Sequence, residues 1–343
     1  MIENVKIQFY RIAKCGYYKY GEETPEFGEV GSILNQLYGW VAGNGKSLAE
    51  TCTYELEDGE DTYRTFCFDI KRNKQTGDFV LVTWNETPTN EGRVVTVNGQ
   101  QPVGDAEVSF TDLPDGSIPG YATYFWFVPE RNVFASIRFH HTLLVGKSNL
   151  ERYLREYCAK FTSYVVVEEG DDGAEIIGYS NNNDGDIQHL RADFKSFLFK
   201  KPGQVEALRN TIDSVTKVIR KNRLSPQVAL HRNIWQKMLE GLRVSKEERD
   251  LTADVKIKYE IPFKPTPEQF DEMVQEWEEN HESKWDDIGF KLSGDPEVRW
   301  LSHSVAKSEY ELDVERNNDE IVDAQSLLDT LNENRNVILG LVG

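Results

Sequence analysis

The segment YATYFWFVPERNVFASIRF, residues 121–139, joins two strongly apolar runs through the short sequence Pro-Glu-Arg-Asn. Aromatic and β-branched residues dominate both runs, and that composition is typical of strands. Pro129 occupies a position that proline favours in a tight turn. The segment therefore predicts an antiparallel hairpin with two buried strands.

The sequence on either side of this hairpin extends the same pattern. KSNLERYLREYCAKF (147–161) predicts a helix capped by Ser148 or Asn149, with an apolar face formed by Leu150, Tyr153, Leu154 and Tyr157. NVKIQFYRI (4–12) alternates apolar and polar residues, as a half-buried strand does. SILNQLYGWVAG (32–43) has the spacing of a helix, and residues 162–186 add two more strands. We expect a mainly antiparallel α+β domain over residues 1–195.

Charge is distributed unevenly along the 343 residues, whose formal net charge is -19. Residues 191–246 contain 13 Lys and Arg against 4 acids, a local net charge of +9. Residues 247–343 contain 25 acids against 10 bases, a net charge of -15. Such segregation indicates a nucleic-acid surface, or an electrostatic partnership within or between subunits.

The basic region predicts a helical hairpin over residues 196–250. Its first limb has an apolar seam spaced 3, 4, 3, 4, formed by Val205, Leu208, Ile212, Val215 and Ile219. A second amphipathic segment follows the Asn222–Pro226 turn. Residues 251–343 predict a smaller, acidic α+β C-terminal domain, with a strand at 254–263, a capping box from Thr266 to Gln269 and a closing helix within 317–335. The expected fold class is α+β.

Cations flank the predicted helical seam and form the candidate nucleic-acid-binding set: Lys200, Lys201, Arg209, Lys217, Arg220, Lys221 and Arg223. Five to seven contacts to phosphates would give salt-dependent DNA binding with little sequence preference. The alternative is that the acidic C-terminal part neutralises these cations, within one chain or between subunits. The acidic residues Glu272, Glu276, Glu278 and Glu279 also fit a protein-interaction module or a DNA mimic.

No motif in the sequence names a reaction. AGNGKS (42–47) lacks the spacing of a phosphate-binding loop, and aligning Asp184-Gly185-Asp186 with a calcium loop puts Arg191 where a glutamate is required. The four cysteines and six histidines fall into no zinc-binding pattern. We therefore expect no catalytic residue, cofactor or metal, and a chain that is more consistent with a non-enzyme. A nuclease or hydrolase assembled from scattered residues stays an alternative.

Localisation follows from the apolar pattern. No run approaches 18 apolar residues, and charges at Glu3, Lys6 and Arg11 occupy the place where a signal peptide needs an apolar core. We expect a cytoplasmic protein with no transmembrane segment of its own.

Three stretches resemble the RexA-like family of phage-exclusion proteins: FYRI followed by YY (9–18), YFWFVPERNVFASIRFHHTLLVGKSNLERYLRE (124–156), and VRWLSHSVAKSEYELDV (298–314) before a final helix. The resemblance implies an antiviral, prophage-defence role, a two-domain α+β homodimer, sequence-tolerant DNA binding and a membrane-protein effector as partner. No family motif maps residue by residue onto a binding set. Because this chain is longer and far more acidic, DNA contact would be confined to residues 191–246.

Overall fold

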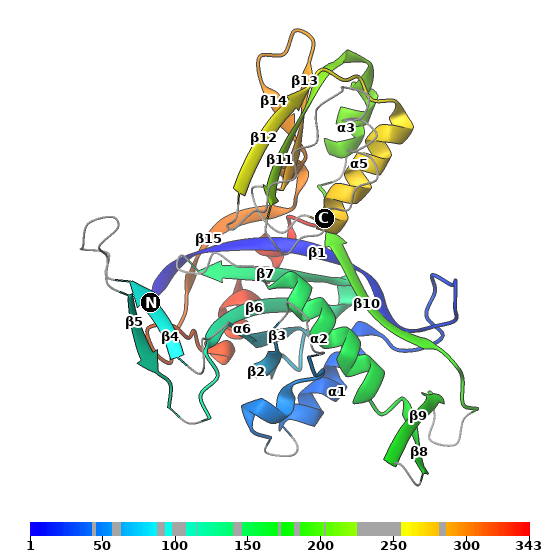
Figure 1. Cartoon of the computed structure of the whole chain (residues 1–343), viewed down its shortest axis with the longest axis vertical. Helices are drawn as coiled ribbons and strands as arrows, with labels where there is room; N and C mark the ends of the chain where they lie inside the picture. Colours follow the sequence, from blue (N-terminus) through cyan, green and yellow to red (C-terminus); the bar gives the residue numbers. More distant parts are fainter. Residues whose placement is uncertain are drawn as a thin grey trace. The chain divides into compact units, whose positions relative to one another are not determined.

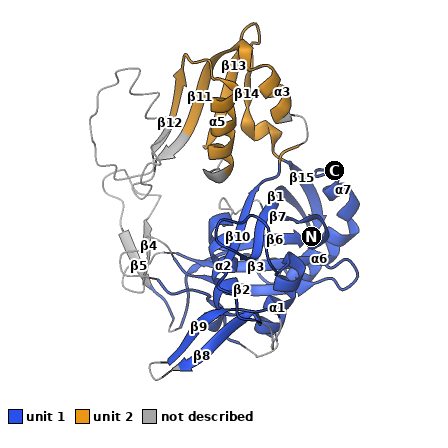
Figure 2. Cartoon of the chain, turned by 90° about the vertical axis from the view of Figure 1, so that its right-hand side faces the viewer, with its two compact units in different colours: residues 1–199, 306–343 blue, residues 200–305 orange. Residues whose placement is uncertain are grey.

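The chain folds into two units, each with its own sheet and helices (Figures 1 and 2). Unit 1 consists of Met1–Phe199 and Ala306–Gly343, and unit 2 of Lys200–Val305. The computed structural model describes residues 1–42, 46–56, 63–87, 93–97, 108–114, 116–139, 146–170, 173–181, 186–201, 204–224, 255–280 and 286–343. The α+β class expected from the sequence is confirmed. The division differs from the three consecutive segments expected, because residues 306–343 return to unit 1.

The predicted aromatic hairpin lies in the middle of the large sheet of unit 1. Strands β6 (Gly120–Val128) and β7 (Val133–Phe139) pair antiparallel from Val128–Val133 to Tyr124–Ile137. The short 3₁₀ helix η2 (Pro129–Arg131) and Asn132, whose φ of 54° is left-handed, close the turn. Both strands are almost wholly buried, as their composition predicts.

The large sheet has seven antiparallel strands in the order β10-β1-β7-β6-β3-β2, with β15 also paired to β1. Besides the hairpin, its strands are β1 (Ile2–Tyr18), β2 (Thr65–Arg72), β3 (Phe79–Glu86), β10 (Arg191–Leu198) and β15 (Lys307–Asp313). One edge of β1 pairs with β7, while the other pairs first with β15 and then with β10. The long first strand therefore joins the beginning, middle and end of the chain.

Two helices, α1 (Val30–Ala42) and α2 (Lys147–Lys160), bury their apolar faces on one side of this sheet. The α2 face predicted from the sequence is confirmed, since all four of its residues are buried: Leu150, Tyr153, Leu154 and Tyr157. The predicted cap is wrong. Gly146, in a left-handed conformation with φ of 65°, precedes the helix, and a Cβ there would lie 2.8 Å from the Thr123 hydroxyl.

The opposite side of the sheet is covered by the last helices, α6 (Ala324–Glu333) and α7 (Arg335–Leu339). Three leucines of α6, Leu327, Leu328 and Leu331, are fully buried in a core shared with β1, β3, β6 and β7. Full burial stabilises the fold by about 1.5–3 kcal/mol for each such side chain. This packing explains why the C-terminal segment belongs to unit 1 instead of a separate domain.

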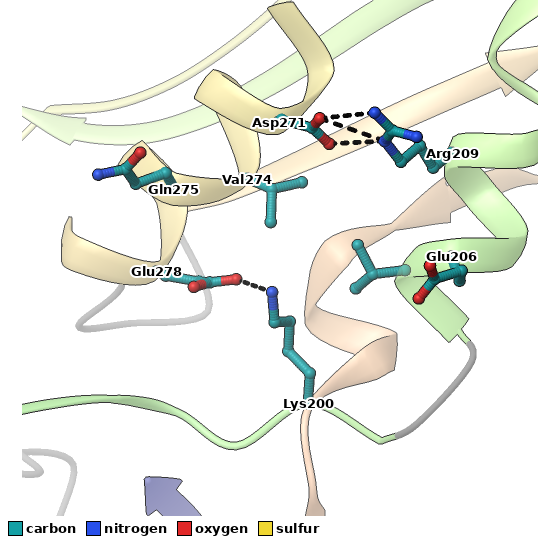
Figure 3. Close-up of a pocket in the computed structure, with 8 residues that line it drawn as sticks. Lys200, Glu206, Arg209, Asp271, Val274, Gln275 and Glu278 are labelled. Carbon is teal, nitrogen blue, oxygen red and sulfur yellow. Dashed lines mark hydrogen bonds and ion pairs between the residues drawn. The ribbon is translucent and has the colours of Figure 1, made fainter. Parts of the chain in front are cut away.

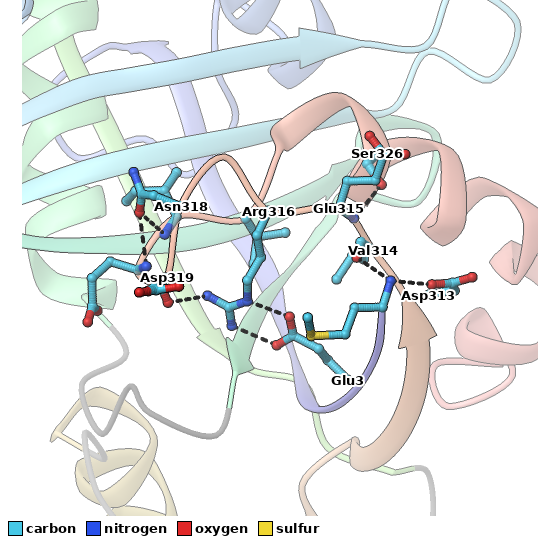
Figure 4. Close-up of polar contacts among 12 residues, drawn as sticks. Glu3, Asp313, Val314, Glu315, Arg316, Asn318, Asp319 and Ser326 are labelled. Atoms are coloured by element: carbon cyan, nitrogen blue, oxygen red, sulfur yellow. Dashed lines mark hydrogen bonds and ion pairs between the residues drawn. The ribbon is translucent and has the colours of Figure 1, made fainter.

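Ion pairs attach the returning segment to the first strand (Figure 4). The guanidinium of Arg316 makes two hydrogen bonds to the carboxylate of Glu3, at 2.5 and 2.7 Å, and both side chains are largely buried. The nitrogen of Met1 lies 2.6 Å from the carboxylate of Asp313. Because Glu3 and Arg316 are far apart in the sequence, no local pattern predicts their contact.

Two isolated hairpins complete unit 1. They are formed by β4 (Arg93–Val97) with β5 (Val108–Asp112), and by β8 (Val165–Gly170) with β9 (Gly173–Tyr179). Residues 43–45 of the AGNGKS segment, and residues 184 and 185 of the segment compared with a calcium loop, lie outside the described residues.

Unit 2 has a four-stranded antiparallel sheet in the order β12-β11-β13-β14. Its elements are α3 (Gln204–Asn210), η3 (Ile212–Ser214), β11 (Val215–Leu224), β12 (Val255–Ile261), α5 (Pro267–Asn280), β13 (Asp287–Leu292), β14 (Val298–Trp300) and η4 (Leu301–Ser304). The predicted capping box of α5 is confirmed, because Thr266 and Gln269 exchange hydrogen bonds at 2.9 and 3.3 Å. Phe270 of α5 packs on Phe290 of β13, with ring centroids 5.1 Å apart.

The first limb of the predicted helical hairpin is wrong. Helix α3 ends at Asn210, and the cations from Lys217 onward lie on strand β11, which pairs with β12 on one side and β13 on the other. Val215, Thr216, Val218 and Ile219 are β-branched and favour a strand. The spacing of these apolar residues also fits a helix. Pairing with β12 and β13 favours the strand instead. The second predicted limb, residues 225–250, lies outside the described residues.

Candidate nucleic-acid interface

Strand β11 divides its cations between two faces of the unit 2 sheet. Successive side chains of a strand point to opposite faces. Val218 and Arg220 share the face covered by α5, since Val218 pairs with Phe290 and Arg220 reaches Glu276 of α5. Lys217 and Lys221 therefore belong to the opposite face. Because side chains alternate between the two faces of a strand, Arg220 and its neighbour Lys221 have different surroundings.

Arg220 is only 5% exposed, and its guanidinium lies 3.7 Å from the carboxylate of Glu276. It pairs in the ladder with Tyr259, whose pKa is raised by burial, an effect that Arg220 partly opposes. A buried charge is tolerated where an opposite charge accompanies it. Arg220 therefore serves the packing of α5 on the sheet.

Two further predicted cations lie at a pocket of about 370 Å³ between α3 and α5 (Figure 3). Arg209 makes a two-pronged contact with Asp271, with hydrogen bonds of 2.9, 2.9 and 3.2 Å. This hydrogen bonding raises the pKa of Arg209 above its usual value. Lys200 forms an ion pair with Glu278. Acids of α5 thus neutralise both cations, as the intramolecular alternative predicts.

Two other predicted cations, Lys201 and Arg223, are held in unit 2 through their backbones. The backbone nitrogen of Lys201 donates to the carbonyl of Ser304 at 2.7 Å, and its side chain is half-buried. Arg223 pairs with Lys256 in the β11–β12 ladder, and its side chain lies outside the described part. Of the acids considered for an interaction module, Glu276 and Glu278 contact cations of their own unit.

The sheet face opposite α5 concentrates cations that sequence reasoning only partly found. We call it the lysine face and define it by Lys217, Lys221, Lys258, Lys291 and Trp300. Lys217 lies directly opposite Lys291, and Lys221 directly opposite Lys258. Like charges directly opposite each other destabilise an antiparallel pair. Two such pairs on one face therefore carry a cost to folding.

Two carboxylates accompany the four lysines. Glu260 lies 3.6 Å from Lys217 and 3.8 Å from Lys258, and all three side chains are about half exposed. Asp287 lies at the end of the face and is buried. Its carboxylate accepts hydrogen bonds from the hydroxyl of Ser302 at 2.6 Å and from the backbone nitrogen of Ser302 at 3.1 Å. The face keeps an excess of positive charge.

An aromatic ring accompanies these cations. The ammonium of Lys221 lies 3.7 Å from the centroid of the Trp300 ring. Trp300 pairs with Gly289, and a Cβ on Gly289 would lie 2.8 Å from the ring. Gly289 thus lets the indole pack closely across the backbone of β13.

The alternation in VKIKYEI (255–261) is a signal that could have identified Lys258, because its apolar residues share one face. Lys291 and Trp300 join the lysine face only through the order and register of the strands. No sequence period contains that information.

Comparisons with known proteins give no relative: no family model, no curated protein and no solved structure matches the chain. Within the described ranges, no group of three or more His, Cys, Asp or Glu side chains is arranged to hold a metal ion. In the same part of the chain, no helix has both the length and the apolar character to cross a membrane.

Proposed function

We propose that the chain binds nucleic acid, DNA in the first instance, through the lysine face of unit 2. The observation that supports this proposal is the pair of directly opposed lysines, Lys217–Lys291 and Lys221–Lys258. A phosphate backbone relieves their mutual repulsion and releases its own counterions, so binding gains from the arrangement that folding disfavours.

The proposed contacts differ from those expected from the sequence. Lys217 and Lys221 are retained, and Lys258 and Lys291 are added. Lys200, Arg209 and Arg220 are omitted, because each is paired with a separate acid of α5, whereas Lys217 and Lys258 share the single carboxylate of Glu260. Contacts through lysine ammonium groups alone carry no base information, so the proposed binding is tolerant of sequence.

The biological setting stays a prediction. The resemblance to RexA-like proteins implies phage exclusion, a homodimer and a membrane-protein effector, and we retain these as hypotheses linked to DNA binding. The interaction-module alternative has less support, since two of its four glutamates contact cations within unit 2.

The test is a salt titration of DNA affinity with the variant Lys217→Gln/Lys258→Gln. Each lysine that neutralises a phosphate contributes about 0.7–0.9 to the slope of log affinity against log salt. The double variant should weaken binding at low salt and flatten the slope by about twice that amount. Fluorescence anisotropy of a labelled oligonucleotide measures both quantities.

The matched control is Arg209→Gln/Lys264→Gln. It removes the same charge from the same unit, at an arginine paired with Asp271 and a lysine paired with Asp213. The control should bind like the wild type. Equal losses in both variants would reduce the effect to net charge, and absence of wild-type binding at low salt would refute the proposal.

A further inference from the structure

We infer that the ligand of the lysine face is single-stranded DNA, with an unpaired base stacked on Trp300. This inference rests on the proposed function and specifies its ligand. The observation behind it is the position of Trp300, an aromatic ring packed on the sheet backbone among the opposed lysines. Proteins that bind single strands combine cations that follow the backbone with aromatic rings on which bases stack.

The environment of the indole makes it a platform. Gly289 has no side chain, and any Cβ there would meet Val298 at 2.5 Å and the indole at 2.8 Å. The ring can therefore approach the backbone of β13 closely. Trp300 lies on β14, an edge strand of the sheet, and is half-buried. A larger residue at position 289 would push the ring off the sheet.

Lys221 contacts the ring through its ammonium, at the end of a long and flexible side chain. A cation over an aromatic face can be displaced by another group that stacks there. A base that takes this place leaves the ammonium of Lys221 next to the sugar–phosphate chain of the same nucleotide. Trp300 would thus stack on the base, and Lys221 would contact the phosphate.

Duplex DNA does not fit this arrangement as well. Its bases already stack on each other, so their faces are closed to a protein ring unless a base is flipped out or a step is opened. Trp300 packs against the strand backbone and does not project from a loop or a helix that could enter a groove. Only the lysines of the face would then contribute to duplex binding.

The experiment compares a labelled single strand with the blunt duplex of the same sequence, using the wild type and the variants Trp300→Leu and Trp300→Phe. We expect the wild type to prefer the single strand by about tenfold or more. Loss of one base–aromatic stack weakens binding by roughly 5- to 150-fold, so Trp300→Leu should lose that much on the single strand only. Trp300→Phe keeps a ring and should stay within about threefold.

A second measurement needs no variant. An abasic strand of equal length keeps the phosphates and removes the bases, so the wild type should bind it roughly 5- to 150-fold more weakly. Equal affinity for abasic and normal strands, or for duplex and single strand, would overturn the inference while leaving the proposed function intact. Failure of the wild type to bind either form would overturn both.

Discussion

Substitution of Arg220 tests directly whether this cation stabilises unit 2 or contacts the ligand. The variant Arg220→Met keeps the length and apolar stem of the side chain and removes its charge. Glu276 then faces the covered side of the sheet without the guanidinium 3.7 Å away. We expect a less stable unit 2 and unchanged DNA affinity, since the lysine face lies on the other side of β11.

The magnitude follows from burial. Removing one partner of a fully buried ion pair costs about 3–5 kcal/mol, and an exposed pair contributes about 0–1 kcal/mol. The Arg220 side chain is 6% exposed and that of Glu276 is 21% exposed, and their separation exceeds hydrogen-bonding distance. We therefore expect a loss of about 2–3 kcal/mol.

Hydrogen exchange measured by mass spectrometry suits this test, because a chain with two units need not unfold in one step. Peptides covering β11 and β12 should exchange about 30- to 150-fold faster in Arg220→Met, while peptides of β6 and β7 in unit 1 keep their rates. The double variant Arg220→Met/Glu276→Leu should recover most of the loss, because an apolar pair replaces the charges. Unchanged exchange combined with weaker DNA binding would refute the assignment of Arg220 to folding.

Three further predictions concern unit 1. Arg316→Ala should lower the free energy of unfolding by about 1–3 kcal/mol in urea titrations, because it removes a largely buried two-pronged contact with Glu3. The control Lys6→Ala should change it by less than about 1 kcal/mol, because the Lys6–Glu309 pair is exposed. Equal effects of the two substitutions would contradict this prediction. Burial raises the pKa of Tyr10 to about 12, so the folded state keeps the neutral phenol while the unfolded state loses its proton near pH 10. Stability should hold below pH 10 and fall between pH 10 and 12, and Tyr10→Phe should make the fall in melting temperature shallower. Burial raises the pKa of the thiols of Cys15, Cys67 and Cys158, and it raises that of Cys158 to about 12. A thiol reagent at pH 8 should therefore modify the half-buried Cys52 first. The variant Cys52→Ser should abolish that fast reaction.

Local patterns predicted those elements whose partners lie nearby in the sequence. The hairpin around Pro129 and the Thr266–Gln269 capping box depend on contacts within a few residues, and the helical period of α2 marks the face that the sheet covers. All three predictions are confirmed. The segment from Val215 to Leu224 could not be assigned this way. Its apolar residues fit both a helical seam and a strand, and the choice depends on β12 and β13, which begin more than thirty residues later.

The candidate site shows the same limit. Charge counting identified the basic region, and Lys217 and Lys221 lie on the lysine face. The pairing of Lys200 with Glu278 and of Arg209 with Asp271 depends on the packing of α3 against α5, which no period in the sequence reveals. Gly289 and Trp300 lie opposite each other only because β14 follows β13 in that register.

The two candidate partners of the basic region, its own acids and a nucleic acid, are compatible because β11 is a strand. On a helix, Lys217, Arg220 and Lys221 would lie at neighbouring angles and would share one partner. On a strand, Arg220 turns towards Glu276 of α5, while Lys217 and Lys221 turn to the opposite face. There Lys291 lies opposite Lys217, and Lys258 and Asp287 lie on either side of Lys221. Neutralisation on one side therefore does not remove the positive charge on the other. The double substitution Arg220→Val/Ile219→Lys would move a cation from the α5 side of the sheet to the lysine face, between Lys217 and Lys221. It should lower the stability of unit 2, because both Arg220 and the buried Ile219 are lost.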